Sequence, residues 1–380
     1  MPFTSGVFAN VSGATSASTG QIVQSSVWNA IHADYSAALN EVANQLMSTT
    51  TYKNVLWMNG GLEVWQRNTS VSIAASTTAY TSDRWYLDTD ANQASVVSRQ
   101  TGLTNKSSYC ARIQRTAAET GVGEVVFGYP LDTDELIRLR GSLCAISITL
   151  RAGANWSPAS GAITVGFRTG TGAVGKRGTG PFTNETDVIE QAANITTTAT
   201  VYNYTSAAIV PTNITQAELS LTWTPVGTAG ASDYFEIDDV QLISVAASAA
   251  ADYIPDDFEV LPLNIMIDGC KRHYYKSFAY DSVVGYDTID IPNSIKAWAQ
   301  AAEIVGIFSI FPVSLRTAPD TTRYPIASVS ASGFIGINVS ASYGGLNTTA
   351  GVNGILVYSS VSVSTANAAY AIHIVASAGI

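Results

Sequence analysis

Residues 25–46 carry the clearest helical pattern in the chain. Apolar side chains recur there in five steps over 18 residues, a mean step of 3.6, which predicts an amphipathic helix that begins at Ser25 or Ser26. The apolar stripe consists of Trp28, Ile31, Tyr35, Leu39, Val42 and Leu46. The first 20 residues are rich in Gly, Ser, Thr and Ala and predict an extended arm. Residues 1–50 are therefore expected to form an arm and an anchoring helix.

The apolar stripe of this helix needs a partner surface. Packing against the following domain and association with copies of itself in a trimeric bundle both meet that need. The spacing departs from a strict heptad, so the sequence does not predict a long coiled coil.

From about residue 53 the pattern changes to short β-branched and aromatic runs between turn residues. The clearest runs are residues 123–131, 142–153, 161–170, 217–227 and 234–245. This spacing predicts an antiparallel β-sandwich of the jelly-roll type over residues 53–257. A connector rich in Pro, Ala and Asp follows, and later runs, from residues 270–280 onward, predict a smaller C-terminal β-sandwich over residues 262–380. The expected fold class is mostly β.

The run YFEIDDVQLI, residues 234–243, places three carboxylates beside one another. Strict alternation along a strand would put Asp238 on the face of Glu236 and Val240, and Asp239 on the opposite face. Adjacent strand residues that point to opposite sides do not form a catalytic pair. The sequence therefore predicts a closing strand here rather than an active site.

The charge content narrows the range of partners. Charged residues make up 13% of the chain, about half the usual share, and the net charge is −10. The 19 basic residues are scattered, so the sequence predicts no nucleic-acid partner and no basic membrane-surface patch. No stretch is long and apolar enough to suggest membrane insertion, and no signal peptide is visible.

Cysteines and histidines give little support to catalysis or metal binding. Cys110, Cys144 and Cys270 lie far apart, which favours reduced thiols and maturation in a cytoplasm and provides no zinc site. The three histidines have no neighbouring ligand at a convincing spacing, and each is expected to be a surface or packing residue. The glycine-rich stretch 170–175 lacks the helix that a phosphate-binding loop requires. We therefore expect that the chain is not an enzyme and requires no cofactor.

Aromatic side chains are the more informative class. Exposed indole and phenol rings stack on sugar rings without needing charge, although core packing is the ordinary role of such residues. The candidates for glycan contact are Trp65, Trp85, Tyr86, Trp156 and Trp223.

Several motifs resemble those of bacteriophage tail-fibre and related virion proteins. NGGLEVWQRNTS (59–70) followed by DRW (83–85) resembles the opening of that family, and CKRHYYKS (270–277) resembles its connector. FPVSLRTAP (311–319) is similar to a strand of its terminal domain. Leu315 stands where Met is usual and His273 where Tyr is usual. The resemblance covers roughly residues 55–320 in order.

The first β domain is also similar to carbohydrate-binding jelly rolls. Those modules open with N-G-x-F-E and close with D-D-V, and many tie the two strands with a structural calcium ion. The resemblance places Glu63, Asp238 and Asp239 in these positions, as candidate ligands for calcium together with backbone carbonyls. The alternative is that these carboxylates accept hydrogen bonds from turn amides or from Arg84.

These resemblances imply a structural virion appendage, a fibre or spike that attaches to host surface glycan. The N-terminal region would bind other virion proteins and set a homotrimer, the jelly roll would contact bacterial surface polysaccharide, and residues 262–380 would form the distal tip. Localisation in the virion, after assembly in the host cytoplasm, follows. Two alternatives stay open: a capsid or tail decoration protein with a purely structural role, and a spike that cleaves polysaccharide. Cleavage would require two carboxylates facing one groove.

Overall fold

The computed structural model describes the sandwich almost continuously and the rest of the chain in segments. The described residues are 3–4, 7–8, 53–158, 161–245, 254–255, 257–280, 282, 284, 295–298, 306–325, 334–336, 346–359 and 369–379. The predicted helix and its six apolar residues lie outside them. Residues Met1–Lys53 form one compact unit and Asn54–Ile380 another. In the first unit, β1 (Phe3–Thr4) pairs with β2 (Val7–Phe8).

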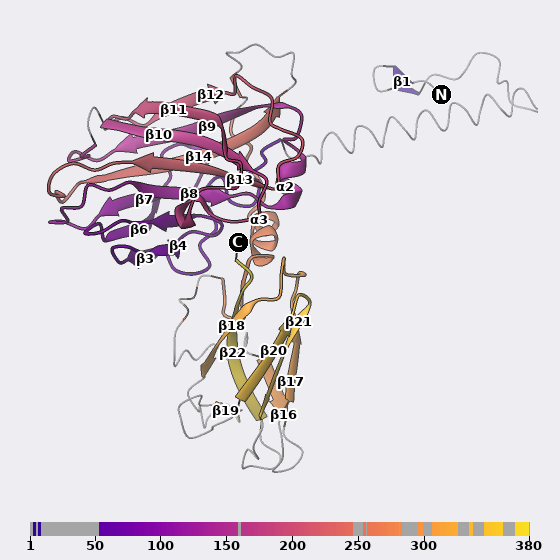
Figure 1. Cartoon of the computed structure of the whole chain (residues 1–380). Helices are drawn as coiled ribbons and strands as arrows, with labels where there is room; N and C mark the ends of the chain where they lie inside the picture. The colour runs from indigo at the N-terminus through magenta and orange to yellow at the C-terminus, as the bar shows by residue number, and fades with distance from the viewer. Residues whose placement is uncertain are drawn as a thin grey trace, which may run out of the picture. The chain divides into compact units, whose positions relative to one another are not determined.

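Two six-stranded antiparallel sheets make up the sandwich (Figure 1). The first sheet has the order β11 (Thr186–Asn194), β10 (Ala162–Gly170), β13 (Gln216–Trp223), β8 (Val125–Pro130), β5 (Tyr86–Asp88) and β4 (Thr78–Tyr80). The second has the order β12 (Thr200–Thr205), β9 (Leu143–Ala152), β14 (Tyr234–Val245), β7 (Tyr109–Arg115), β6 (Ser95–Thr101) and β3 (Ser70–Ile73). Successive strands from β7 to β10 alternate between the sheets, which is jelly-roll connectivity. The prediction of a mostly antiparallel β fold is confirmed.

Apolar side chains at every second position of the strands form the core between these sheets. On β10 and β13, Phe167 lies opposite Leu219 and Val165 opposite Leu221, and all four side chains are buried. Such cross-strand apolar pairs stabilise the sheet and fix its register, because a slip by one residue would turn the apolar set outward. The five strongest strand predictions correspond to β8, β9, β10, β13 and β14.

The closing strand β14 contains a β-bulge that the alternation pattern did not reveal. Its pairing register with β9 shifts between Asp238 and Gln241, and Asp239 has a left-handed φ of 48°. The extra residue changes which residues face the core: Ile237 and Val240 both pack into it. The predicted strict alternation was therefore wrong beyond Asp238.

The opening segment fixes the bulge by a close backbone approach. The amide of Val240 donates to the carbonyl of Gly60 at 3.0 Å. A Cβ atom added to Gly60 would lie 2.4 Å from the carbonyl oxygen of Val240, so glycine is required at this position. The N-G and D-D-V sequences thus meet in the folded chain.

In the part of the chain that the structure describes, two short α-helices interrupt the strands. They are α2 (Thr133–Ile137), whose N-terminus has a capping box made by Asp132 and Glu135, and α3 (Leu263–Lys271). A 3₁₀ helix, η2 (Arg177–Thr179), lies in the loop after β10. The sequence predicted a strand over residues 270–280; instead α3 continues to Lys271, and only β15 (Tyr274–Lys276) is extended.

Two further sheets contain the later strands. In the first, β15, β16 (Ile295–Trp298), β18 (Asp320–Pro325) and β19 (Phe334–Gly336) each pair with β22 (Ala369–Ser377). The second has the order β17 (Gly306–Ile310), β21 (Gly354–Ser359) and β20 (Leu346–Gly351). The described residues of this region are thus largely extended, as the sequence predicted.

Candidate functional site

Four of the five aromatic candidates are buried, three of them in the sandwich core and Tyr86 beneath the loop after β10. Trp65 is 3% exposed, Trp223 4%, and Trp85 and Tyr86 0%. Trp85 stacks on Phe127 with ring centroids 4.9 Å apart. Rings buried to this degree present no face to a sugar. The structure therefore corrects the expectation that these four side chains contact glycan.

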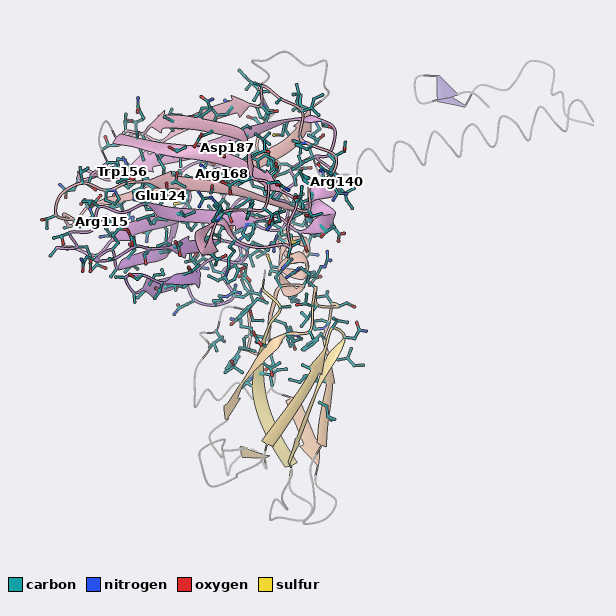
Figure 2. The ribbon with its side chains drawn as sticks, viewed as in Figure 1. Arg115, Glu124, Arg140, Trp156, Arg168 and Asp187 are labelled. Atoms are coloured by element: carbon teal, nitrogen blue, oxygen red, sulfur yellow. The ribbon has the colours of Figure 1, made fainter. Side chains whose placement is uncertain are left out.

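Trp156 is half-buried at one end of the sandwich (Figure 2). Its ring lies 5.3 Å from that of Phe235 in an edge-on contact and 5.9 Å from that of Trp223. Its indole Nε1 donates to the carbonyl of Gly161 at 3.0 Å. The core and a loop therefore use much of this side chain, although part of it stays exposed.

The three acidic candidates hold the loop between β6 and β7. Asp238 Oδ2 accepts a 2.7 Å hydrogen bond from the amide of Leu103, and Asp239 Oδ2 accepts a 2.6 Å bond from the hydroxyl of Thr104. Both aspartates reach the same loop, so the prediction that they point to opposite sides was wrong. The bulge, which adds a residue at Asp239, is the physical reason.

Glu63 completes this carboxylate cluster. It accepts hydrogen bonds from the amides of Ser108 and Tyr109, the latter at 3.2 Å. Burial, and next the nearby carboxylate of Asp239, raise the pKa of Asp238 to about 7. Burial also raises the pKa of Glu63. Hydrogen bonds from loop amides and hydroxyls thus offset the repulsion between these carboxylates.

These oxygen atoms are directed toward the loop rather than toward a common point. Within the described residues, no group of three or more His, Cys, Asp or Glu side chains is arranged to hold a metal ion. Of the two roles considered for these carboxylates, the geometry supports hydrogen bonding to turn amides. The calcium ion that the resemblance implies is the alternative to these hydrogen bonds, and chelation distinguishes the two.

A second buried carboxylate lies on the outer face of the first sheet. Glu218 accepts hydrogen bonds from the hydroxyl of Tyr86 at 2.8 Å and from the amide of Arg177 at 2.9 Å. The amide of Gly178 in turn donates to the Tyr86 hydroxyl at 2.8 Å. Burial raises the pKa of Glu218 to about 7. These contacts fasten the loop after β10 across the sheet, and they account for the burial of Tyr86.

Arg84, of the DRW motif, joins the sandwich to the segment that follows α3. Its guanidinium donates to Glu135 Oε2 at 2.9 Å and to the carbonyl of Pro130 at 2.7 Å, and it lies 2.8 Å from His273 Nδ1. Burial, and then Arg84, lower the pKa of His273 to about 3, so its ring is neutral. A neutral ring that accepts at Nδ1 carries its proton on Nε2, which faces Asp132 Oδ2 at 3.3 Å.

Gln66 makes a second connection to the same segment. Its Nε2 donates to Asp83 Oδ1 at 2.9 Å and to the carbonyl of Tyr274 at 3.2 Å. The motifs that carry the resemblance to virion proteins therefore contact one another. We call this contact region, formed by Gln66, residues 83–85 and residues 270–277, the joint. The local pattern of these motifs did not indicate that they bind one another.

The two described histidines, His273 and His373, are buried, as the expected packing role requires. His373 stacks on Phe278 with centroids 4.1 Å apart, and its Nδ1 lies 3.0 Å from the hydroxyl of Ser277. That hydroxyl also accepts a 2.9 Å bond from the amide of Ile374. The three cysteines, Cys110, Cys144 and Cys270, are also buried, and each is a free thiol.

Two cavities lie on adjacent faces of α3, and Asp268 lines both of them. One, of about 430 Å³, is lined by residues that include Gln66, Asn264, Asp268, Lys271, Tyr275 and Tyr280. The other, of about 480 Å³, is lined by residues that include Trp57, Ile265, Asp268, Arg272, Val313 and Ser314. Both volumes fall within the range of about 300–1,000 Å³ typical of small-molecule sites. Each combines aromatic rings with hydrogen-bonding side chains.

Trp57 was not among the sequence candidates. It stands two residues before the N-G motif, and nothing in its local pattern distinguishes it from the tryptophans that the core buries. Its half-buried ring lies against α3, an element that the sequence did not predict.

Comparisons with known proteins give fold-level similarity at low scores. No protein-family model and no curated protein matches the chain. Among solved structures, the enzymatically active domain of bacteriophage CBA120 tailspike protein 4 is 12% identical, with a TM-score of 0.29, over 51% of this chain and 22% of that one. A structure described as "CBM4 structure and function" is 17% identical, with a TM-score of 0.30, over 49% and 99%.

A family 11 carbohydrate-binding module from Clostridium thermocellum is 11% identical, with a TM-score of 0.27, over 47% of this chain and all of that one. This chain thus matches about a fifth of the tailspike structure and the full length of the modules. At these scores the similarities assign neither ligand nor activity to this protein. None of the helices in the described segments is long and apolar enough to span a membrane.

Proposed function

We propose that this protein is a non-enzymatic appendage of a bacteriophage or phage-derived particle that attaches to glycan on the host cell. The observation that carries the glycan-binding part is the pair of cavities beside α3, in which aromatic rings lie next to carboxylate, amide and cationic groups. Pyranose rings have apolar C–H faces and hydroxyl edges, and such a lining complements both.

The virion part of the proposal draws on the motif resemblance and on the joint that the motifs form. A network that includes the buried Arg84–Glu135 ion pair holds the α3–β15 segment against the sandwich. A particle appendage benefits from such a connection, because force on the attached surface passes through it. The N-terminal region would bind other virion proteins, and the chain would assemble as a homotrimer.

A polysaccharide panel tests the glycan assignment. The full chain is labelled and applied to immobilised O-antigens, capsular polysaccharides and xylan, all chosen to contain vicinal diols, each with a duplicate treated with periodate to cleave those diols. We expect binding to one or more untreated polysaccharides and loss of that binding after periodate. No binding to any member, or binding that survives periodate throughout, would contradict glycan attachment and favour a purely structural decoration protein.

A further inference from the structure

We propose that the Trp57 cavity is the glycan-contacting site and holds one hexopyranose ring of a polysaccharide, with the Trp57 indole as the stacking surface. We define the Trp57 cavity as the 480 Å³ cavity between α3, Trp57 and residues 313–314. This inference rests on the proposed function and assigns it a location and a ligand class.

Trp57 is held in position by α3. A Cβ atom placed on Gly269 would lie 2.7 Å from Cη2 and Cζ3 of the Trp57 ring, so the edge of the indole rests directly on the helix backbone. The ring is half-buried and lines the cavity. Trp65, Trp85 and Trp223 are buried instead. A fixed and partly open indole provides a sugar platform without the entropic cost of ordering a mobile side chain.

The other side chains that line the cavity include both apolar and polar groups, as a sugar ring requires. Ile265 and Val313 add apolar surface beside the indole, which suits the C–H face of a pyranose. Asp268, Arg272 and Ser314 add a carboxylate, a guanidinium and a hydroxyl at the same cavity. Hydroxyl groups around a sugar ring both donate and accept, so a mixed set of this kind can satisfy them.

Among the described residues, the charged groups at this cavity pair with exposed partners. Asp268 accepts from Lys271 at 2.9 Å, with the Asp268 side chain 59% exposed. Arg272 pairs with Asp134 at 3.2 Å, and the Asp134 side chain is 67% exposed. Exposed pairs of this kind contribute little to stability, so sugar hydroxyls can replace them at low cost.

The 430 Å³ cavity, which shares Asp268 with the Trp57 cavity, is less suited, because several of its other polar groups are used internally. Tyr280 donates to the carbonyl of Glu63 at 3.1 Å and accepts from the amide of Trp65 at 3.2 Å. Gln66 Nε2 donates to Asp83 and to the Tyr274 carbonyl. Lys276 donates to the carbonyl of Ser282 at 2.6 Å. These side chains hold the joint together.

Four substitutions test the site in the full chain. Trp57→Phe keeps an aromatic face, whereas Trp57→Leu keeps apolar packing without one. Asp268→Asn alters an exposed group at the cavity, and Asp187→Asn is its matched control, an aspartate that pairs with Arg168 on the sandwich at 2.5 Å (Figure 2). Affinity is measured by biolayer interferometry for the polysaccharide that gives the strongest periodate-sensitive signal, after thermal melting shows that each variant folds.

We expect Trp57→Leu to weaken binding about ten-fold and Trp57→Phe to stay within about three-fold, because stacking on an aromatic face adds to the contribution of buried area. Asp268→Asn should weaken binding several-fold and Asp187→Asn should have no effect. If the wild type binds and both Trp57→Leu and Asp268→Asn bind equally well, the location is wrong while the proposed function stands. If Trp57→Leu fails to fold, unchanged binding by Asp268→Asn alone overturns the site. If the wild type binds no polysaccharide, the proposed function itself fails.

Discussion

Replacement of Arg84 by alanine should strongly destabilise the protein at the joint between the sandwich and α3. The Arg84 and Glu135 side chains are each 1% exposed, and their charged atoms lie 2.9 Å apart. Removal of the guanidinium leaves Glu135 buried beside Asp132 without its cationic partner. Loss of one member of a buried ion pair costs about 3–5 kcal/mol, which is a large part of the stability of a typical domain.

The size of this loss should depend on pH. Burial already raises the pKa of Glu135, although Arg84 opposes the shift. Without Arg84 the pKa rises further, so folded Glu135 binds a proton more tightly than the unfolded chain does. A carboxyl whose pKa is raised by folding favours the folded state at low pH, and that benefit is lost as the pH rises. The Arg84→Ala variant should therefore be less impaired at pH 5 than at pH 8.

Urea denaturation followed by tryptophan fluorescence at pH 5 and pH 8 measures both effects. The double variant Arg84→Met with Glu135→Gln is the control, since it removes both charges of the buried pair while Gln keeps the capping box with Asp132. A loss below about 1 kcal/mol for Arg84→Ala, or a loss of the same size at both pH values, would refute the assignment of Arg84 as the charge partner of Glu135.

Three further predictions concern the carboxylate cluster and the assembly. Burial and Asp239 raise the pKa of Asp238 from 3.8 to about 7, so the contribution of Asp238 to stability should decline as the pH rises from about 4 to about 7. In urea titrations Asp238→Asn should show a flatter dependence of stability on pH, and an equally steep profile in the variant would contradict this prediction. Because loop groups already donate to these carboxylates, EDTA should leave the Tm unchanged; a fall in Tm that calcium reverses would instead place a cation in the cluster. Light scattering should give three copies of the 40.0 kDa chain, and a monomer at micromolar concentration would contradict the proposed trimer.

Strands were the part of the fold that the sequence predicted best. Period-two apolar runs such as residues 142–153 and 161–170 carry their own register, and the structure has β9 and β10 there. The bulge in β14 was missed because it depends on a partner far away in sequence: the amide of Val240 bonds to Gly60. α3 was missed because its nine residues are too few for a helical period to stand out beside the aromatic run that follows.

The binding candidates were harder to predict than the strands. Residue type marks Trp85 and Trp57 as equally suitable for stacking, yet Trp85 lies against Phe127 in the core while Trp57 lines a cavity. The difference arises from tertiary packing, which no local pattern encodes. The acidic candidates were closer to correct, because the opening and closing motifs do meet, with loop amides and hydroxyls as the partners of Glu63 and Asp238.

Fluorine NMR of the protein labelled with 5-fluorotryptophan tests the central claim most directly. The chain has seven tryptophans, and the resonance of Trp57 is assigned by its absence from the spectrum of Trp57→Phe. Titration with a soluble fragment of the bound polysaccharide should shift the Trp57 resonance and leave those of the buried Trp65, Trp85 and Trp223 in place. A saturable shift of another tryptophan, such as Trp156, with the Trp57 resonance unmoved would contradict the account.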